Sequence, residues 1–260
     1  MNALRIVAVL AAMSGQAEVG DAGAADRDGS EAAAHYARFR ELAESHVVFV
    51  DSRGNTRAVL RDKDIFRWTN PLRGSIAGAV YLWTHQGRPH ATIGVWRNRT
   101  ATMDSYELQS LSTGPLVTRA TGYPDWNPRV AGLEFAPLPA APPPADSAVR
   151  RLAQMRGLGR ERFSALLVTE KLRMLPQPIY RYEGKLPPGV LDGAMFSFAQ
   201  GTDPELLLLL EARTADGPSP WHFAFAPSTS GRVYGILDGE RIWDNADQLS
   251  KGTFVNYSYR

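Results

Sequence analysis

The sequence predicts an α+β fold made mostly of antiparallel β-strands, arranged as two related halves that each combine one helix with a sheet. Helical segments are too few to supply the crossovers that parallel strands need, so the strands should pair antiparallel. A proline-rich stretch at residues 136–146 (APLPAAPPPAD) cannot continue a helix or a central strand, and similar sequence lies on both sides of it. We expect the halves to be packed together or to share one sheet or barrel.

The N-terminal segment has the features of an export signal. Residues 1–17 contain a basic Arg5, an apolar run and the small residues Gly15 and Ala17 at a cleavage position. The apolar run is too short to span a bilayer. Residues 18–30 are rich in Gly, Ala and Asp and predict a flexible leader. We therefore expect a secreted or periplasmic protein without a transmembrane segment; the alternative is that the apolar run is a strand or helix of the fold.

The first half, residues 31–135, is predicted to open with a helix over residues 30–44. Tyr36, Phe39 and Leu42 recur at helical spacing and would form its apolar stripe. Strands follow where apolar and polar residues alternate between turn residues. They are expected at residues 47–51, 65–70, 77–84, 91–98, 105–112 and 130–135.

The second half, residues 147–260, is predicted to open with a helix capped by Asp146 or Ser147. Its apolar side would contain Val149, Leu152, Met155, Phe163 and Leu166. Strands are expected at residues 179–182, 193–199, 206–213, 221–226, 233–237 and 241–244. Residues 206–210 are all leucine, which is typical of a central strand buried on both faces.

The order of residue types is similar on the two sides of the proline-rich stretch. IFRW at residues 65–68 corresponds to IYRY at residues 179–182, and GAVYLW at 78–83 corresponds to GAMFSF at 193–198. Side chains alternate with period two, so Ala79, Tyr81 and Trp83 would share a face, as would their counterparts in the second half. This order predicts an internal duplication; the alternative is two unrelated sheets that are both rich in aromatic residues.

These segments also carry a resemblance to other proteins. FRWTNP at residues 66–71, GAVYLW at 78–83 and LRMLPQPIYRY at 172–182 resemble a group of secreted proteins from planctomycete-type bacteria. The resemblance covers residues 35–245. It implies export and a common fold, but that group has no established activity, so no catalytic residue is carried over.

Composition excludes several classes of function. The chain has 260 residues with 29 basic and 27 acidic side chains, a balance that gives no electrostatic footprint for nucleic acid. The absence of cysteine excludes disulfides, thiolate metal sites and cysteine nucleophiles. Phosphate-binding glycine loops, nucleophile elbows and zinc-protease motifs are also missing from the sequence. We expect no cofactor and no nucleic-acid partner.

The ligand-binding candidates are two arginines and two tryptophans. Arg67 and Arg181 occupy corresponding positions between aromatic residues, and two such guanidinium groups could hold a carboxylate or phosphate. The alternative is that each pairs with a local carboxylate. Trp126 and Trp243, together with Trp83 and Trp96, could line an apolar or sugar-stacking pocket, or could belong to the core. The second helix also has a basic face, which could touch anionic material or be solvated.

Catalytic residues are not assigned by the sequence. His85 and His90 could bind a metal together with Asp104 or Glu107, but a polar hairpin tip is the favoured interpretation and no metal site is expected. A pair of carboxylates could hydrolyse a glycoside, and His222 could act as a general base or be structural. The carboxylates considered for such a pair are Asp125, Glu183, Asp192, Glu211 and Asp244.

The sequence therefore favours an extracytoplasmic, non-catalytic module that binds an anionic or apolar ligand or an envelope component. Two alternatives stay open. One is a secreted hydrolase of the glycosidase or esterase type that uses carboxylate or histidine side chains. The other is a structural or assembly protein.

Overall fold

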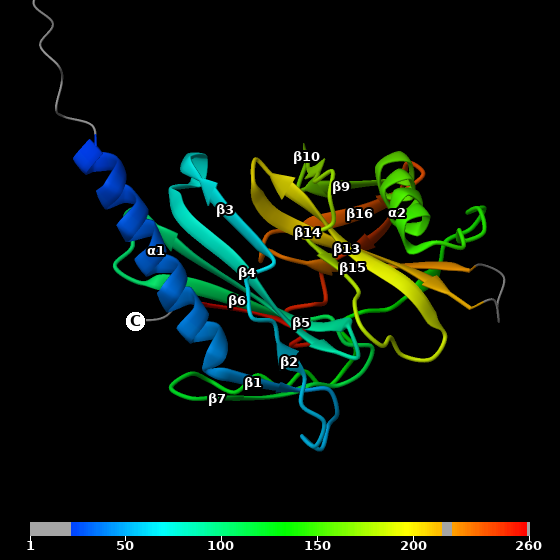
Figure 1. The fold of residues 1–260 in the computed structure, drawn as a ribbon, viewed down its shortest axis with the longest axis horizontal. Coiled ribbons are helices and arrows are strands. Elements are labelled where there is room, and N and C mark those ends of the chain that lie inside the picture. Colours follow the sequence, from blue (N-terminus) through cyan, green and yellow to red (C-terminus); the bar gives the residue numbers. More distant parts are fainter. Residues whose placement is uncertain (1–21, 215–219, 259–260) are drawn as a thin grey trace, which may run out of the picture.

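Two six-stranded antiparallel sheets lie against each other in the computed structural model, and each has one helix on its outer side (Figure 1). The structure describes residues 22–214 and 220–258. The predicted signal at residues 1–17 lies outside this range. The two large sheets are separate, so the halves are packed together rather than joined in one sheet.

The first sheet has the strand order β18-β6-β5-β4-β2, with β3 also paired to β4. Its long central hairpin consists of β4 (Ser75–His85) and β5 (Arg88–Asn98). The remaining elements of this half are α1 (Ala22–Glu44), β1 (His46–Phe49), β2 (Val59–Leu60), β3 (Phe66–Asn70), a 3-10 turn (Pro71–Arg73), β6 (Asp104–Ser110) and β7 (Val117–Ala120). Strands β1 and β7 form a small separate sheet.

The second sheet has the order β11-β13-β14-β15-β8, with β12 also paired to β13. Its central hairpin consists of β13 (Val190–Gln200) and β14 (Asp203–Arg213). The elements around the hairpin are β8 (Ala136–Pro137), α2 (Ala148–Arg162), β9 (Phe163–Leu167), β10 (Glu170–Lys171), β11 (Arg173–Met174), β12 (Tyr180–Arg181), β15 (Trp221–Pro227), β16 (Val233–Leu237) and β17 (Glu240–Asp244). Strands β10, β9, β16 and β17 form a four-stranded sheet.

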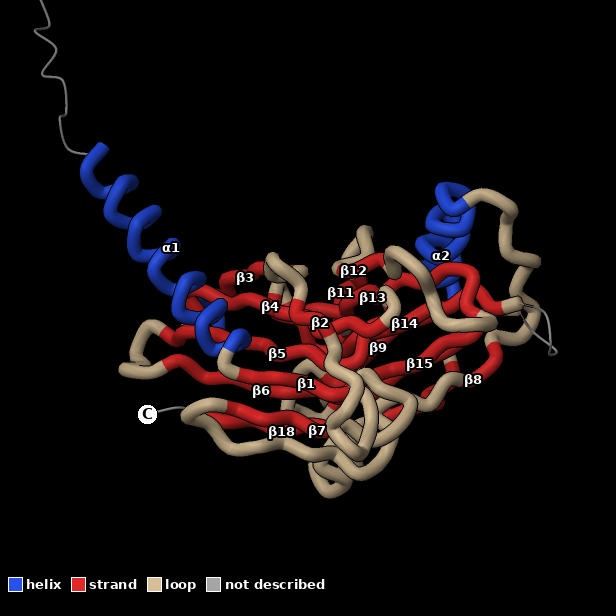
Figure 2. The backbone as a smooth tube through the Cα atoms, turned by 60° about the horizontal axis from the view of Figure 1, so that its bottom comes forward, coloured by secondary structure: helices blue, strands red, loops and turns tan. Residues whose placement is uncertain are grey.

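The last strand crosses between the halves. β18 (Phe254–Ser258) follows the whole second half in sequence, yet it pairs with β6 of the first sheet (Figure 2). In the second sheet, the corresponding outer position beside β15 is taken by β8, which lies within the proline-rich stretch. Each large sheet is therefore completed by a strand from outside its own helix-and-sheet unit.

Three hydrophobic clusters hold these layers together. In the first half, α1 places Phe39 on the face of the sheet that carries Ala79, Tyr81 and Trp83, as the alternation of that strand predicts. In the second half, α2 and β9 cover the opposite outer face, where every second leucine of β14 is buried. The third cluster joins the inner faces and contains Leu82 together with Leu207 and Leu209. The prediction that residues 206–210 are buried on both faces is confirmed.

Three sequence-based assignments are corrected by the structure. The second helix ends at Arg162, and Phe163 and Leu166 belong to strand β9, which pairs with β16. Ser147 is the N-cap of this helix, with its side chain accepting a hydrogen bond from the Arg150 backbone amide. No strand forms at residues 130–135, and α1 begins at Ala22, earlier than expected and within the segment predicted to be a leader. Strands β2, β7, β10, β11 and β18 were not predicted, nor was β8, which lies in the stretch predicted to be a linker.

Neither of the helices in the described part of the chain is long and apolar enough to cross a membrane.

Candidate functional site

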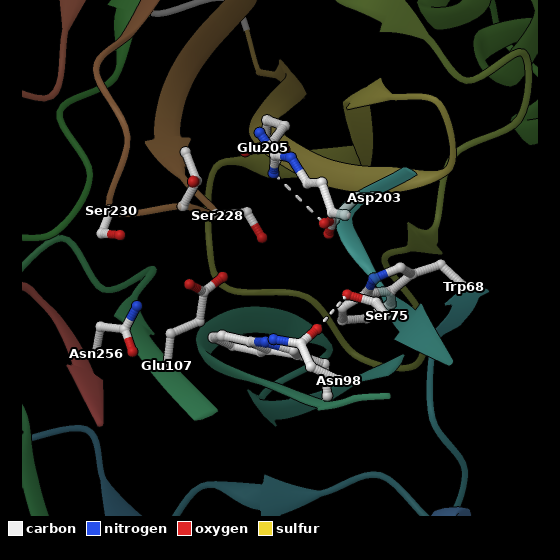
Figure 3. Close-up of a pocket in the computed structure, with 12 residues that line it drawn as sticks. Trp68, Ser75, Asn98, Glu107, Asp203, Glu205, Ser228, Ser230 and Asn256 are labelled. Atoms are coloured by element: carbon white, nitrogen blue, oxygen red, sulfur yellow. Dashed lines mark hydrogen bonds and ion pairs between the residues drawn. The ribbon is translucent and has the colours of Figure 1, made fainter. Parts of the chain in front are cut away.

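A polar cavity of about 260 Å³ lies between the two halves (Figure 3). Its lining combines residues of the first sheet with residues of the second hairpin and of the turn after β15. These residues are Trp68, Arg73, Ser75, Trp96, Asn98, Glu107, Asp203, Glu205, Ser228, Thr229, Ser230 and Asn256. We refer to this cavity as the acidic cavity because three carboxyl groups face it with one arginine.

The start of β14 and the middle of β6 place the carboxyl groups. Asp203 and Glu205 stand at the start of β14, where a bulge interrupts the pairing with β13, and both line the cavity; Leu207 continues on the inner face. On β6, Tyr106 and Leu108 face the cluster under α1, and Glu107 between them therefore faces inward. Two different halves of the chain thus bring buried carboxyl groups to one space.

Among the described residues, Arg73 is the only basic side chain in the lining. It ends the 3-10 turn after β3, and Gly74 follows it with φ +77°, a left-handed conformation that suits glycine. Its Nη1 donates a hydrogen bond to Glu205 Oε1 and lies 3.6 Å from Asp203 Oδ2. The second oxygen of Glu205, Oε2, is buried and has no hydrogen-bond partner among the described residues. Arg73 thus pairs with Glu205 and Asp203. In the part of the chain that the structure describes, no basic side chain of the lining pairs with Glu107.

The surroundings raise the pKa of all three carboxyl groups. Burial, followed by the nearby charges of Asp203 and Glu205, raises the pKa of Glu107 well above its ordinary value. Burial and the charge of Asp203 raise the pKa of Glu205 to about 7, although Arg73 opposes this. Burial likewise raises the pKa of Asp203 to about 6. At neutral pH the cavity therefore holds protons that a bound cation would displace.

Aromatic and neutral polar groups form the rest of the wall. The indole of Trp68 packs on Gly78 of β4, and its Nε1 is buried with no hydrogen-bond partner among the described residues. Ser75 donates a hydrogen bond of 2.9 Å to Asn98 Oδ1, as the dashed line in Figure 3 marks. The side chain of Ser228 lowers the pKa of Glu107, against the larger effect of burial. The cavity therefore offers carboxylates, hydroxyls and indole rings to one small molecule.

The predicted arginine candidates lie elsewhere, each within its own half. Arg67 makes a bidentate pair with Asp64, and its guanidinium carbon lies 4.0 Å from the centre of the Tyr36 ring on α1. Arg181 donates to Asp192 Oδ2 at 2.6 Å and to the backbone oxygen of Ala148 on α2. Both arginines thus connect a sheet to its helix and bind local carboxylates. The structure does not place them together around one ligand.

The predicted tryptophan candidates also lie apart. Trp126 is 3% exposed in the cluster under α1, and its Nε1 donates to the backbone oxygen of Gly252 at 2.7 Å. Trp243 packs at the margin of the α2 cluster, with its ring 5.8 Å from that of Phe225. Neither of them lines the acidic cavity.

The histidines and carboxylates considered for catalysis do not form a common centre. The rings of His85 and His90 are 5.9 Å apart, and burial lowers the pKa of His90 to about 3. Within the described residues, no group of three or more His, Asp or Glu side chains could hold a metal.

The candidate carboxylates each have a local partner. Asp125 accepts a backbone hydrogen bond from Ala120, Glu183 pairs with Arg61, and Asp244 pairs with Arg232. Asp192 binds Arg151 and Arg181, and Glu211 binds Arg88 and Arg213.

The sequence interpretation missed Asp203 and Glu205 and considered Glu107 only as a metal ligand. One signal was present: Asp203-Pro-Glu205 puts two acidic residues on one face of a strand whose next residues are all leucine. Comparison of the chain with protein-family models, with curated proteins and with solved structures finds no match.

Proposed function

We propose that the protein is a binding module and that the acidic cavity takes a small ligand carrying an ammonium or guanidinium group. The observation that carries the proposal is the convergence of Glu107, Asp203 and Glu205 on one cavity, where Arg73 is the sole cation that the described residues contribute to the lining. A buried carboxylate is stable only when it is paired or protonated. A bound cation would supply the missing pair.

The charge of the cavity decides between ligand classes. An anion would meet three acidic groups and would raise their pKa values further, so the anionic ligand expected from sequence is disfavoured at this place. A cation would lower those pKa values and would release protons as it binds. Trp68 and Trp96 fit the same class, because indole rings attract cations through their faces.

The size of the cavity favours a small molecule. About 260 Å³ is slightly below the usual range of small-molecule pockets, about 300–1,000 Å³. A linear diamine or an amino sugar is of the appropriate size. The hydroxyl and amide groups of Ser228 and Asn256 would then bind the polar remainder of the ligand.

Calorimetric titration at pH 7.5 tests this proposal with putrescine, agmatine and glucosamine, and with 1,4-butanediol and glucose as uncharged matches. The amines should bind and the uncharged compounds should not, and the heat in buffers of different ionisation enthalpy should reveal proton release. Glu205→Gln and Glu107→Gln should each weaken amine binding at least about tenfold, which corresponds to about 1.4 kcal/mol.

Glu161→Gln is the matched control, because Glu161 is an exposed carboxylate on α2. The proposal is wrong if no amine binds, or if the two cavity variants bind amines as the wild-type protein does.

A second candidate function is glycoside hydrolysis, and one observation favours it. Glu107 is held protonated by burial while the more acidic Asp203 faces the same cavity, and a carboxylic acid beside a carboxylate is the pair that such hydrolysis needs. Release of nitrophenol from a panel of aryl glycosides, abolished in Glu107→Gln, would support hydrolysis. Amine binding without turnover would favour the binding module.

We further propose that the two halves arose by duplication. The recurrence of strand pairing supports this: β2 and β3 both pair with β4, and β11 and β12 both pair with β13. In the first half β1, before the hairpin, pairs with β7, after it; in the second half β9 pairs with β16 in the same way.

We also propose that the chain is exported through residues 1–17. Fusion of residues 1–30 to a reporter that is active only outside the cytoplasm would test export.

A further inference from the structure

A second cavity, of about 590 Å³, lies at the other end of β14 and has the opposite charge. The acidic cavity uses Asp203 at the first residue of this strand, and the second cavity uses Arg213 at its last. Arg213 is in phase with Leu207 and Leu209 on the inner face of the strand, and Asp203 lines the acidic cavity beyond the bulge near the start of the strand. Arg88, Arg213 and His222 supply the charged and titratable groups of the lining, which we call the basic cavity.

The pairing of the strands shows that the two cavities lie at corresponding positions of the two sheets. Arg213 pairs with Val190 at the base of the second hairpin, as Asn98 pairs with Ser75 at the base of the first. Arg88 opens the strand after the first hairpin turn, as Asp203 does after the second. Each cavity is thus lined by the base of one hairpin and by the first residue after the turn of the other. The residue after the turn is acidic in the acidic cavity and is an arginine in the basic cavity.

The arginines of the basic cavity meet on one buried carboxylate. Glu211, which is 0% exposed, accepts a hydrogen bond of 2.7 Å from Arg88 Nε and another of 2.7 Å from Arg213 Nη2. The hydroxyl of Tyr182 also donates to it at 3.0 Å. Two guanidinium groups therefore share one carboxylate among the described residues, and one positive charge is left in excess.

The arginines are held in place and still have donors to offer. The ring of Phe135 lies 4.8 Å from the guanidinium carbons of both Arg88 and Arg213, so it lies against both of them. Arg88 Nη2 and His222 Nδ1 are buried and make no hydrogen bond within the described part of the chain. A buried donor without a partner is unfavourable, and an acceptor from a ligand would relieve it.

We propose that the basic cavity binds a small ligand through a carboxylate group. One excess positive charge matches a monoanion better than a phosphate dianion, and a guanidinium fork matches the planar geometry of a carboxylate. Thr113 and Thr214 line the same space and would contact the rest of the ligand, as would the apolar surface of Phe135. This site is separate from the acidic cavity and does not depend on the function proposed for it.

The test uses benzoate as the probe, with inorganic phosphate as the competing anion and sodium chloride as the ionic-strength control. Binding is followed by calorimetry and by the imidazole resonances of His222 in NMR spectra of the full chain. Benzoate should bind and shift the His222 signals, while chloride at equal ionic strength should not. Arg213→Gln should weaken benzoate binding at least tenfold.

Two controls keep the test decisive. Arg119→Gln removes an exposed arginine that lies over the ring of Phe49, and it should leave benzoate binding unchanged. Glu205→Gln alters the acidic cavity and should also leave benzoate binding unchanged, so the two sites can fail separately. Should Arg213→Gln not fold, His222→Gln replaces it, with a loss of at least threefold expected.

The proposal is overturned if benzoate leaves the His222 signals unmoved, or if the folded variant binds it as the wild type does. Phosphate that binds more tightly than benzoate would overturn the assignment of a carboxylate.

Discussion

The indole ring of Trp68 packs directly on Gly78, its cross-strand neighbour, so closely that a Cβ atom on Gly78 would overlap three of its ring carbons. Trp68 lines the acidic cavity, and the glycine therefore sets the position of one cavity wall. Tyr182 packs on Gly193 in the second sheet in the same way, and its hydroxyl reaches Glu211 beside the basic cavity. In each half, an aromatic side chain packs on a glycine of the neighbouring strand at the inner face of the sheet.

Replacement of Gly78 by alanine should destabilise the protein by about 1–3 kcal/mol, because the indole must move out of a packed position. Urea unfolding measures the change. Gly114→Ala is the matched control, since a Cβ there meets no atom within 4 Å. Equal stability of the two variants would show that the indole moves aside freely.

Stability should fall as pH rises through the window set by Glu205. Folding raises the pKa of Glu205 from 4.5 to about 7, so the native state binds more protons than the unfolded state between these values. The stabilisation is fully present below about pH 4.5 and is lost by about pH 7; its size is roughly 3 kcal/mol. Urea unfolding at pH 5, 6, 7 and 8 should show this fall, with a smaller fall in Glu205→Gln. An unchanged pH dependence in that variant, with Glu161→Gln as control, would refute the assignment.

Arg181 should matter more for folding than Arg67. Asp192, the partner of Arg181, is 4% exposed, and loss of one of its two arginines leaves a buried carboxylate poorly compensated. Arg67 is largely exposed and pairs with Asp64 at the surface. We expect Arg181→Ala to lower the free energy of unfolding by about 2–4 kcal/mol and Arg67→Ala by at most about 1 kcal/mol. Equal losses in urea unfolding would contradict this ranking.

Removal of residues 253–260 should destabilise the first sheet, although these residues follow the second half. The truncation deletes β18, exposes the edge of β6 and removes Asn256 from the acidic cavity. Hydrogen exchange should then accelerate in β5 and β6 more than in β13 and β14. Uniform acceleration across both sheets would show instead that the two halves unfold as one unit.

Period-two alternation made the central hairpins predictable from sequence. The faces of Ala79, Tyr81 and Trp83 and the double burial of residues 206–210 follow from that period and from uninterrupted apolar sequence. Strand β9 was not predictable in this way, because Phe163 and Leu166 are three residues apart and continue the apolar side of the helix before them. Its pairing with β16, seventy residues later, decides its structure.

The loop at residues 130–135 shows a second limit. The backbone amides of Gly132 and Leu133 both donate to the oxygen of Ser112, and a Cβ on Gly132 would overlap Ser110. This contact joins residues that are far apart in the sequence. It forms in place of the strand that the apolar residues predicted. The acidic cavity was not predicted for a related reason. Glu107 and Glu205 line one cavity only because the second hairpin packs against the first sheet.

The crossing of β18 imposes an order on assembly. During synthesis, β4, β5 and β6 are complete long before residues 254–258 have been made. Until then, the backbone groups on the edge of β6 that faces away from β5 lack their partner strand. The half that is synthesised first is therefore the one that is finished last.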